Sequence, residues 1–330
     1  MSTRRRGPAV AKRQLRLRLR RARYDANLTQ NDIAEQLGWS SSKVLRLENG
    51  QTPFQLSDVL ALLSVYPQLN AEREELSELA RDARRPTLSS RYRAVLTPQF
   101  AEWLEHEAYA SAIRQYENQF VPGVLQTNDY AMGIVAGLLG SADPERAEQI
   151  VDARIERAEP LLSPDGPRME FIIDESALHK AIGNEDGRHG YQPMIDQLRH
   201  LQQYNTVGRQ AVGEVIEDDR NPNISVQIAP LIMGAYAAMR GPFEIAEFPS
   251  GDTDPMVYFE NPDGDEVVKD QYDDIARYID LFTDLRKAVP GPAETNVHLG
   301  AIIGHMEAYP QGLKAAAASA RKARKPTASS

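Results

Sequence analysis

Cysteine is absent from the 330 residues of this chain, and long apolar runs are absent as well. Without cysteine there is no disulfide, no thiolate metal ligand and no cysteine nucleophile. No stretch approaches the roughly 18 apolar residues that cross a bilayer, so we expect no membrane segment. Three arginines at 4–6 precede the charged stretch AVAKRQLRLRLRR rather than the apolar core of a secretion signal. These absences predict a cytoplasmic protein.

The sequence also lacks the usual catalytic patterns. None of its six histidines belongs to an HExxH or HxxxH pair, and there is no GxSxG, P-loop or GxGxxG motif. Asp174, Glu175 and His179 lie close together and such pairs can perform acid–base catalysis, but neither a nucleophile nor a metal motif accompanies them. The acidic clusters at 217–219 and 263–266 lack the spacing of a calcium-binding loop. We therefore expect no enzyme activity, no catalytic residue, no cofactor and no metal.

What the sequence does have is a strong segregation of charge. Residues 1–50 hold 12 basic and 4 acidic residues, whereas residues 51–330 hold 26 basic and 43 acidic ones. The net charge of −9 would by itself disfavour nucleic acid as a partner. A basic footprint needs only one face of a protein, however. The N-terminal region therefore predicts either a nucleic-acid interface or a solvated basic tail.

Hydrophobic periodicity predicts a domain of five helices over residues 13–84. A basic disordered arm is expected over 1–12, and a linker over 85–91. Thr29 and Asp32 have the spacing of a capping box, and Gly38 suits the left-handed conformation of a tight turn. Ser40 or Ser41 can cap the next helix. The predicted helices cover about 13–26, 29–37, 40–48, 56–66 and 70–84.

The stretch LTQNDIAEQLGWSSSKVLRLENG (28–50) has the features of two helices that cross closely. Ala34 is the small residue that such a crossing needs, and Val44 and Leu47 form one narrow buried stripe on the second helix. The opposite face stays free, and an α-helix fits the major groove of DNA. On that face Arg46 can pair bidentately with guanine, Lys43 can reach a base or a phosphate, and two serines are less selective readers. Those serines are Ser41 and Ser42.

This stretch resembles the Cro/repressor-like family of helix-turn-helix proteins, also called the XRE family. The resemblance covers about 55 residues and rests on Leu28-Thr29-Gln30, Ile33-Ala34, Leu37-Gly38, Val44 and Leu47-Glu48-Asn49-Gly50. It implies that Gln30 and the backbone near Asn49 contact phosphate, and that Arg23 and Glu48 form a structural pair. It also implies a homodimer on a palindromic operator in double-stranded DNA. The alternative is a helical bundle that binds protein instead of DNA. Trp39 in the turn either packs within the domain or touches the DNA backbone.

The remaining sequence predicts an α+β domain, a mixed sheet with flanking helices, over residues 92–307. A flexible tail is expected over 308–330. Helices are predicted over 98–118, 127–139, 144–160, 191–205 and 270–287. Strands are predicted at Arg168–Asp174, Asn223–Ala229, Phe243–Phe248, Met256–Glu260 and Glu266–Val268.

This second domain resembles a domain of unknown function that actinobacterial regulators join to such a helix-turn-helix. Their PGLLQT-like turn and Tyr-Ala read here as VPGVLQT (121–127) and Tyr130-Ala131, with Val124 in place of the usual leucine. The segment at about 205–221 is longer here than is usual for this domain. The turn is either a structural helix start or part of a ligand or peptide pocket. That pocket would be lined by Gln126, Tyr130, Glu175 and His179.

Together these patterns predict a DNA-binding transcriptional regulator whose C-terminal domain senses a small ligand or a partner protein. Some relatives in the resembling group lie beside a gene for a small toxin-like protein. The alternative is therefore an antitoxin-like protein that chiefly binds a small partner protein and autoregulates its operon. A third and weaker class is an enzyme with a DNA-binding appendix.

Overall fold

The computed structural model describes residues 8–139, 143–182, 191–205, 210–211, 214–215, 223–249, 254–261, 264–269 and 271–308. Contacts divide the chain into two compact units. Unit 1 comprises Met1–Ser111, Ala246–Met256 and Val267–Asp270, and unit 2 comprises Ala112–Ile245, Val257–Glu266 and Gln271–Ser330. The division therefore falls beyond the predicted linker at 85–91, part of which is the short helix α6 (Leu88–Arg91) of unit 1.

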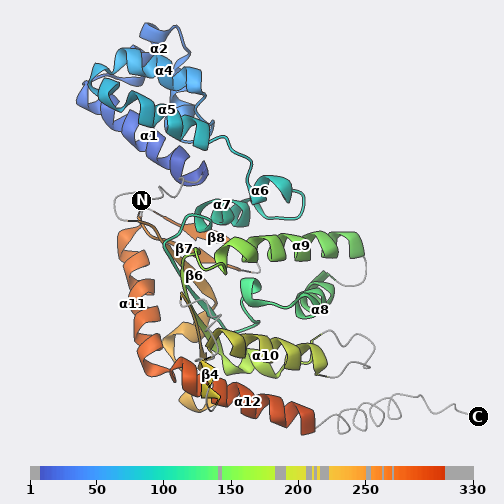
Figure 1. Cartoon of the computed structure of the whole chain (residues 1–330). Helices are drawn as coiled ribbons and strands as arrows, with labels where there is room; N and C mark the ends of the chain where they lie inside the picture. Colours follow the sequence, from blue (N-terminus) through green and yellow to red (C-terminus); the bar gives the residue numbers. More distant parts are fainter. Residues whose placement is uncertain are drawn as a thin grey trace, which may run out of the picture. The chain divides into compact units, whose positions relative to one another are not determined.

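Unit 1 contains the predicted five-helix domain (Figure 1). Its helices are α1 (Pro8–Asp25), α2 (Gln30–Leu37), α3 (Ser41–Glu48), α4 (Leu56–Val65) and α5 (Arg73–Asp82), with the 3₁₀ turn η1 (Pro67–Glu72) before α5. Helix α7 (Pro98–Glu107) also belongs to this unit. The first helix begins at Pro8, five residues earlier than predicted, because Val10 and Ala11 continue its buried face. Of the predicted arm, residues 8–12 are thus helical, and residues 1–7 lie outside the described residues.

One continuous core holds α1–α5 together. Helix α1 packs against α5 and α3, α2 packs against α3 and α4, and α4 packs against α5. The largest fully buried side chains of this core are Leu15, Ile33, Leu63, Tyr66, Leu76 and Leu79. Burial of side chains this size stabilises a fold by about 1.5–3 kcal/mol each. The crossing of α2 and α3 is therefore fixed by packing from behind, which leaves the outer face of α3 in solvent.

Unit 2 is built on a six-stranded sheet of order β5-β2-β1-β6-β7-β8. Strands β1, β2 and β5 run parallel. Beside β1, Ser111 donates its backbone N–H to the carbonyl of Glu247 (2.7 Å), while the Tyr116 and Phe243 rings lie 5.7 Å apart. Strand β6 therefore runs antiparallel to β1, and the sheet is mixed as predicted. The strands are β1 (Ala112–Glu117), β2 (Arg168–Asp174), β5 (Ile224–Ala229), β6 (Phe243–Glu247), β7 (Met256–Phe259) and β8 (Glu266–Val268).

Helices cover both faces of this sheet (Figure 1). Helix α11 (Tyr272–Ala288) lies on the face of Tyr116 and Phe243, where Phe282 contacts Phe243. Helix α10 packs against the edge strand β5, where Asn205 bonds both backbone groups of Val226. The remaining helices are α8 (Asn128–Leu139), α9 (Pro144–Leu161), α10 (Gln192–Asn205) and α12 (Pro292–Ala308), with 3₁₀ turns η2 (Gly123–Leu125), η3 (Glu175–His179), η4 (Leu231–Met233) and η5 (Ala237–Arg240). The short pair β3 (Gln210–Ala211) and β4 (Glu214–Val215) forms a separate antiparallel sheet.

The predicted helix over 98–118 is wrong in its second half. Helix α7 ends at Glu107, and Ala112–Glu117 form strand β1 inside the sheet. The strand forms because β2 lies hydrogen-bonded along it, from Ala112 opposite Arg168 to Glu117 opposite Ile173. That partner is 56 residues away, so local spacing does not reveal it. Helix α12 was not predicted as a separate helix, and the predicted tail lies, apart from Ala308, outside the described residues.

Candidate nucleic-acid interface

The turn between α2 and α3 has the geometry that its residues predict. Thr29 caps α2 in a complete capping box, with its backbone N–H donating to Asp32 Oδ2 at 2.7 Å. Gly38 adopts φ 65°, the left-handed conformation in which a residue with a Cβ is strained. Ser40, not Ser41, caps α3 and accepts the Lys43 backbone N–H. The start and direction of α3 are therefore set by local bonds.

A buried ion pair holds α3 from behind. Arg23 of α1 donates from Nε to Glu48 Oε1 (2.6 Å) and from Nη2 to Glu48 Oε2 (2.9 Å), so the pair is bidentate. Both side chains are less than a tenth exposed. The hydrogen bond to Glu48 is the main reason that the pKa of Arg23 lies above its usual value. Gln30 adds its side-chain amide to Glu48 Oε2 (2.7 Å). This side chain, expected at a phosphate, thus supports the buried carboxylate.

Five residues of α3 and its C-cap share the outward face: Ser41, Ser42, Leu45, Arg46 and Asn49. Each is exposed, and their spacing of one, three and four positions places them along one stripe. Within the described part of the chain, no carboxylate pairs with the Arg46 guanidinium. Leu45 is 45% exposed and was not among the predicted readers. Periodicity gives its position on the open face, and an apolar side chain there can contact a thymine methyl.

Lys43 differs from Arg46 although both were predicted readers. Its Nζ donates to Asp58 Oδ1 at 2.7 Å and lies 3.7 Å from the centre of the Trp39 ring. Asp58 also accepts the Gln55 backbone N–H at the start of α4. Trp39 thus packs against the domain core and against Lys43. The ammonium group of Lys43 joins α3 to α4 in this structure.

The backbone at the end of α3 is fully used by the helix itself. The N–H groups of Asn49, Gly50 and Gln51 donate to carbonyls of the last turn, at 2.9–3.1 Å. Gly50 adopts φ 74°, which favours glycine. The resemblance implies that backbone N–H groups near Asn49 contact phosphate. For them to do so, these hydrogen bonds must change; otherwise side chains make the contact.

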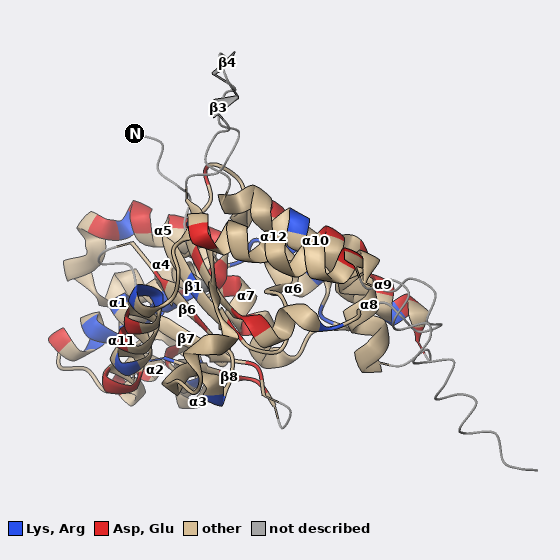
Figure 2. Cartoon of the chain, turned by 90° about the horizontal axis from the view of Figure 1, so that it is seen from below, with Lys and Arg blue, Asp and Glu red and all other residues tan. Residues whose placement is uncertain are grey.

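Much of the basic charge of α1 is neutralised inside unit 1. Five of its seven basic residues pair with carboxylates: Lys12, Arg13, Arg18, Arg21 and Arg23. The other two are Arg16 and Arg20, and Arg20 donates to the Tyr24 hydroxyl at 3.3 Å. Figure 2 shows acidic segments distributed over other elements as well, including α9 and β8. The free positive charge of the described N-terminal residues is thus smaller than the sequence count implies.

The four residues of the predicted pocket in unit 2 have different hydrogen-bond partners. Gln126 donates to the Val121 carbonyl and accepts a hydrogen bond from Arg154 (2.8 Å each), and Tyr130 is fully buried. Glu175 instead contacts His179 at 3.1 Å. No described hydrogen bond or ion pair links Gln126 or Tyr130 to Glu175 or His179. The pocket therefore stays a prediction, which would need Tyr130 to become accessible.

The turn at 121–127 is anchored by a fully buried glutamine. Gln197 of α10 accepts the Thr127 backbone N–H and donates to the Leu125 carbonyl, both at 2.7 Å. Thr127 accepts the Tyr130 backbone N–H at the start of α8. These bonds support the structural interpretation of this turn.

Acidic groups crowd the end of β1 on the face of α9. Arg157 binds Glu244 at 3.1 Å, and Gln115 donates to Glu117 at 3.0 Å. Removal from water raises the pKa of Glu117 well above its usual range, and the negative charges of Glu244 and Glu260 raise it further. The Gln115 hydrogen bond and Arg157 only partly oppose this shift. Burial and the neighbouring carboxylates therefore outweigh the compensation that Glu117 receives.

A second surface surrounds Glu175. Its Oε2 accepts the Leu231 backbone N–H (2.8 Å) and lies 3.1 Å from His298 Nε2. These contacts bring η4 and α12 together. Each of these two elements has an exposed apolar residue next in sequence to its contacting residue. Ile232 is 94% exposed and Val297 is 76% exposed. Apolar side chains as exposed as these are candidates for an interaction surface.

Metal and membrane features are missing from the described residues. None of their helices is long and apolar enough to span a bilayer. Within the same residues, no group of three or more His, Cys, Asp or Glu side chains is arranged to hold a metal ion.

Comparison with known families gives two matches. The family described as "Helix-turn-helix domain" matches residues 14–76. The family described as "Domain of unknown function (DUF5753)" matches residues 100–300. No curated protein and no solved structure matches the chain.

Proposed function

Because the chain belongs to the family described as "Domain of unknown function (DUF5753)" and carries a helix-turn-helix domain ahead of it, we propose that it is a transcriptional regulator of the Cro/repressor-like (XRE) type. It binds double-stranded DNA with α3 in the major groove. The observation that carries this proposal is the outward stripe Ser41, Ser42, Leu45, Arg46 and Asn49. The buried Arg23–Glu48 pair holds α3 in place from the side opposite this stripe.

In this proposal Arg46 is the main base reader. Its guanidinium is exposed and has the planar fork that pairs with guanine O6 and N7. Leu45 and the two serines add weaker preferences. Lys43 reaches DNA only if it leaves Asp58 and Trp39, so we place it second to Arg46.

In vitro selection of random duplexes with the purified full chain tests this function. We expect one enriched operator sequence. Arg46→Ala is expected to lose about 1–3 kcal/mol of affinity for that operator, because one bidentate contact disappears. Arg21→Ala is the matched control, since this exposed arginine of α1 only pairs with Asp25 at 3.8 Å. Failure to enrich any sequence, or equal losses in both variants, contradicts the assignment.

We propose further that the protein acts as a homodimer on palindromic half-sites about one helical turn apart. A single module of this kind buries little surface on DNA, so two copies bind more tightly. The apolar surface at Ile232 and Val297 is the candidate dimer contact. Light scattering of the full chain should give a dimer that Ile232→Lys converts to a monomer. A wild-type monomer, both free and on operator DNA, would exclude this state.

The same apolar surface favours the alternative function, an antitoxin-like protein that binds a small partner and autoregulates its operon. Co-expression with the product of the adjacent gene tests it. A stable complex in size-exclusion chromatography that Ile232→Lys abolishes is the expected result for this alternative. If no complex forms while the operator is still bound, the C-terminal domain receives its signal from a small ligand instead.

A further inference from the structure

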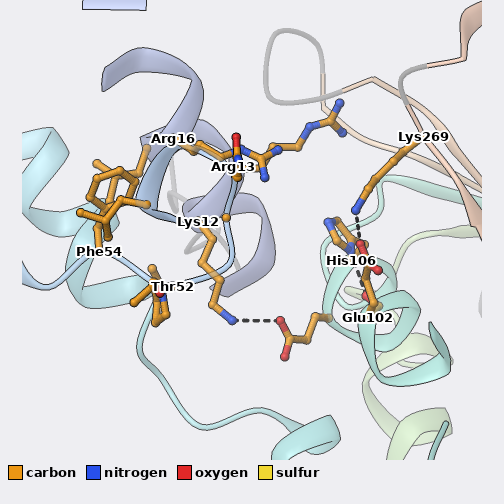
Figure 3. A pocket seen from close by; sticks show the side chains of 15 residues that line it. Lys12, Arg13, Arg16, Thr52, Phe54, Glu102, His106 and Lys269 are labelled. Atoms are coloured by element: carbon orange, nitrogen blue, oxygen red, sulfur yellow. Dashed lines mark hydrogen bonds and ion pairs between the residues drawn. The ribbon is translucent and has the colours of Figure 1, made fainter. Parts of the chain in front are cut away.

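Unit 1 contains a partly open cavity of about 430 Å³ behind the end of α3 (Figure 3). Its walls come from α1, from the segment that follows α3, from α7 and from Lys269 after β8. Figure 3 shows Lys12 and Arg13 on one side and Glu102, His106 and Lys269 on the other. Small-molecule sites commonly occupy about 300–1,000 Å³. The cavity is therefore large enough for a compact ligand.

Three of the four cations in its wall have carboxylate partners. Lys12 binds Glu105 at 3.1 Å, Arg13 faces Asp254 at 3.7 Å, and Lys269 binds Glu102. These pairs leave little charge for a ligand.

Arg16 is the fourth cation and has no such partner among the described residues. Its guanidinium lies directly against Gly50, where an added Cβ would come within 2.5 Å of Nη1. The cavity thus offers one uncompensated positive charge beside the turn that ends α3.

The rest of the wall is apolar or neutral. Leu15, Leu47 and Phe54 are each at most 5% exposed and form an apolar side of the cavity. His106 Nδ1 bonds the Glu102 carbonyl at 2.8 Å and therefore carries the proton. Burial lowers the pKa of His106, which keeps the ring neutral near pH 7. One cation next to an apolar wall suits a ligand with one anionic group and a compact apolar body.

We propose that this cavity is an effector site for a small organic anion, a carboxylate or a phosphate ester on a compact apolar body. The anionic group binds Arg16, and the apolar body lies against Phe54 and Leu15. The wall joins residues from both matched families, since Glu102, Glu105, His106 and Lys269 lie within 100–300. A ligand held there contacts Gly50 and Asn49, so its binding is coupled to the conformation of the end of α3. The binding step does not depend on DNA, whereas the coupling rests on the proposed function.

Benzoate and phenyl phosphate are the probes, and benzyl alcohol is the neutral control. Calorimetry with the full chain is expected to give a dissociation constant of about 1 mM or lower for at least one anion, and no binding of the alcohol. Preference for benzoate or for phenyl phosphate distinguishes a carboxylate effector from a phosphate ester. Absence of binding by both anions overturns the proposal.

Three variants locate the site. Arg16→Gln should weaken anion binding at least tenfold, and Arg21→Gln, the matched loss of an arginine on α1, should leave it unchanged. Thr52→Trp, at an exposed position of the cavity wall, should block the probe while Arg16 remains. Thermal unfolding of each variant checks that the fold is retained. Equal anion binding by wild type and Arg16→Gln overturns the proposal.

A final measurement separates an effector site from a DNA contact. Operator affinity is measured with and without the probe in wild type and in Arg16→Gln. We expect at least a threefold change in wild type and none in the variant. If Arg16→Gln instead weakens binding to every duplex and reduces its salt dependence, with probe binding unchanged, Arg16 contacts phosphate and the proposal is wrong. If the protein binds the probe at Arg16 but binds no DNA, the proposed regulator function is wrong and the proposed anion site still holds.

Discussion

The two units bury ionised groups in opposite ways. In unit 1, Arg23 and Glu48 neutralise each other through two short hydrogen bonds, and Gln30 donates a third hydrogen bond to the carboxylate. In unit 2, burial and two further carboxylates raise the pKa of Glu117, and the Gln115 hydrogen bond and Arg157 oppose this shift only in part. A compensated pair fixes the position of a helix. A partly compensated carboxylate raises the free energy of the folded state, and binding of a proton or a cation would lower it. The comparison shows that charge is compensated at the buried carboxylate of unit 1 and only partly compensated at that of unit 2.

The largest expected effect comes from removing one partner of the buried pair. Glu48→Ala leaves the Arg23 guanidinium buried without its carboxylate, which typically costs about 3–5 kcal/mol. Urea unfolding of the full chain measures this loss. Glu72→Ala is the control, because its pair with Arg18 is solvent-exposed and worth at most about 1 kcal/mol. Similar losses in both variants would mean that the Arg23–Glu48 pair contributes no more than a surface pair.

Removing the charge of Glu117 should change the stability of the fold less than Glu48→Ala does, and should increase it. The raised pKa of Glu117 means that the folded chain retains a proton that the unfolded chain releases near pH 4.5. The carboxylate therefore destabilises the fold above its raised pKa and has no effect below the usual one. Glu117→Gln keeps the oxygen that accepts from Gln115 and is expected to stabilise the protein by about 1 kcal/mol at pH 8.

Unfolding curves at pH 8 and pH 4 measure this difference, with Glu159→Gln, an exposed carboxylate of α9, as the matched control. A gain of the same size at both pH values would show that titration of Glu117 is not its cause.

The smallest effect is expected at Lys43, which is 37% exposed and pairs with the buried Asp58. Lys43→Ala breaks the bond to Asp58 and the contact with Trp39, and should cost about 0.5 kcal/mol of stability. Its operator affinity should fall less than that of Arg46→Ala, because Lys43 is already engaged within the domain. Titration of the selected operator with both variants measures the ranking. A larger loss for Lys43→Ala would reverse the order in which we place the two readers.

Much of unit 1 is predictable because its signals are local. The capping box of Thr29 and Asp32, the turn at Gly38 and the buried stripe of Val44 and Leu47 all lie within a few residues of the structure they specify. Strand β2 at Arg168–Asp174 was also predicted correctly, since its apolar run is bounded by turn residues. Strand β1 was missed because its pairing partners are distant in sequence.

The sequence by itself determined that two crossed helices present one free face, and that positive charge gathers near it. Only the tertiary structure decided which of those charges remain available. It pairs Lys43 with Asp58 of α4, turns Gln30 toward Glu48, and leaves Arg46 and Arg16 without carboxylates among the described residues. The physical reason is that helix periodicity assigns a side chain to a face. Its partner on that face comes from another element, whose position depends on the packing of the whole core.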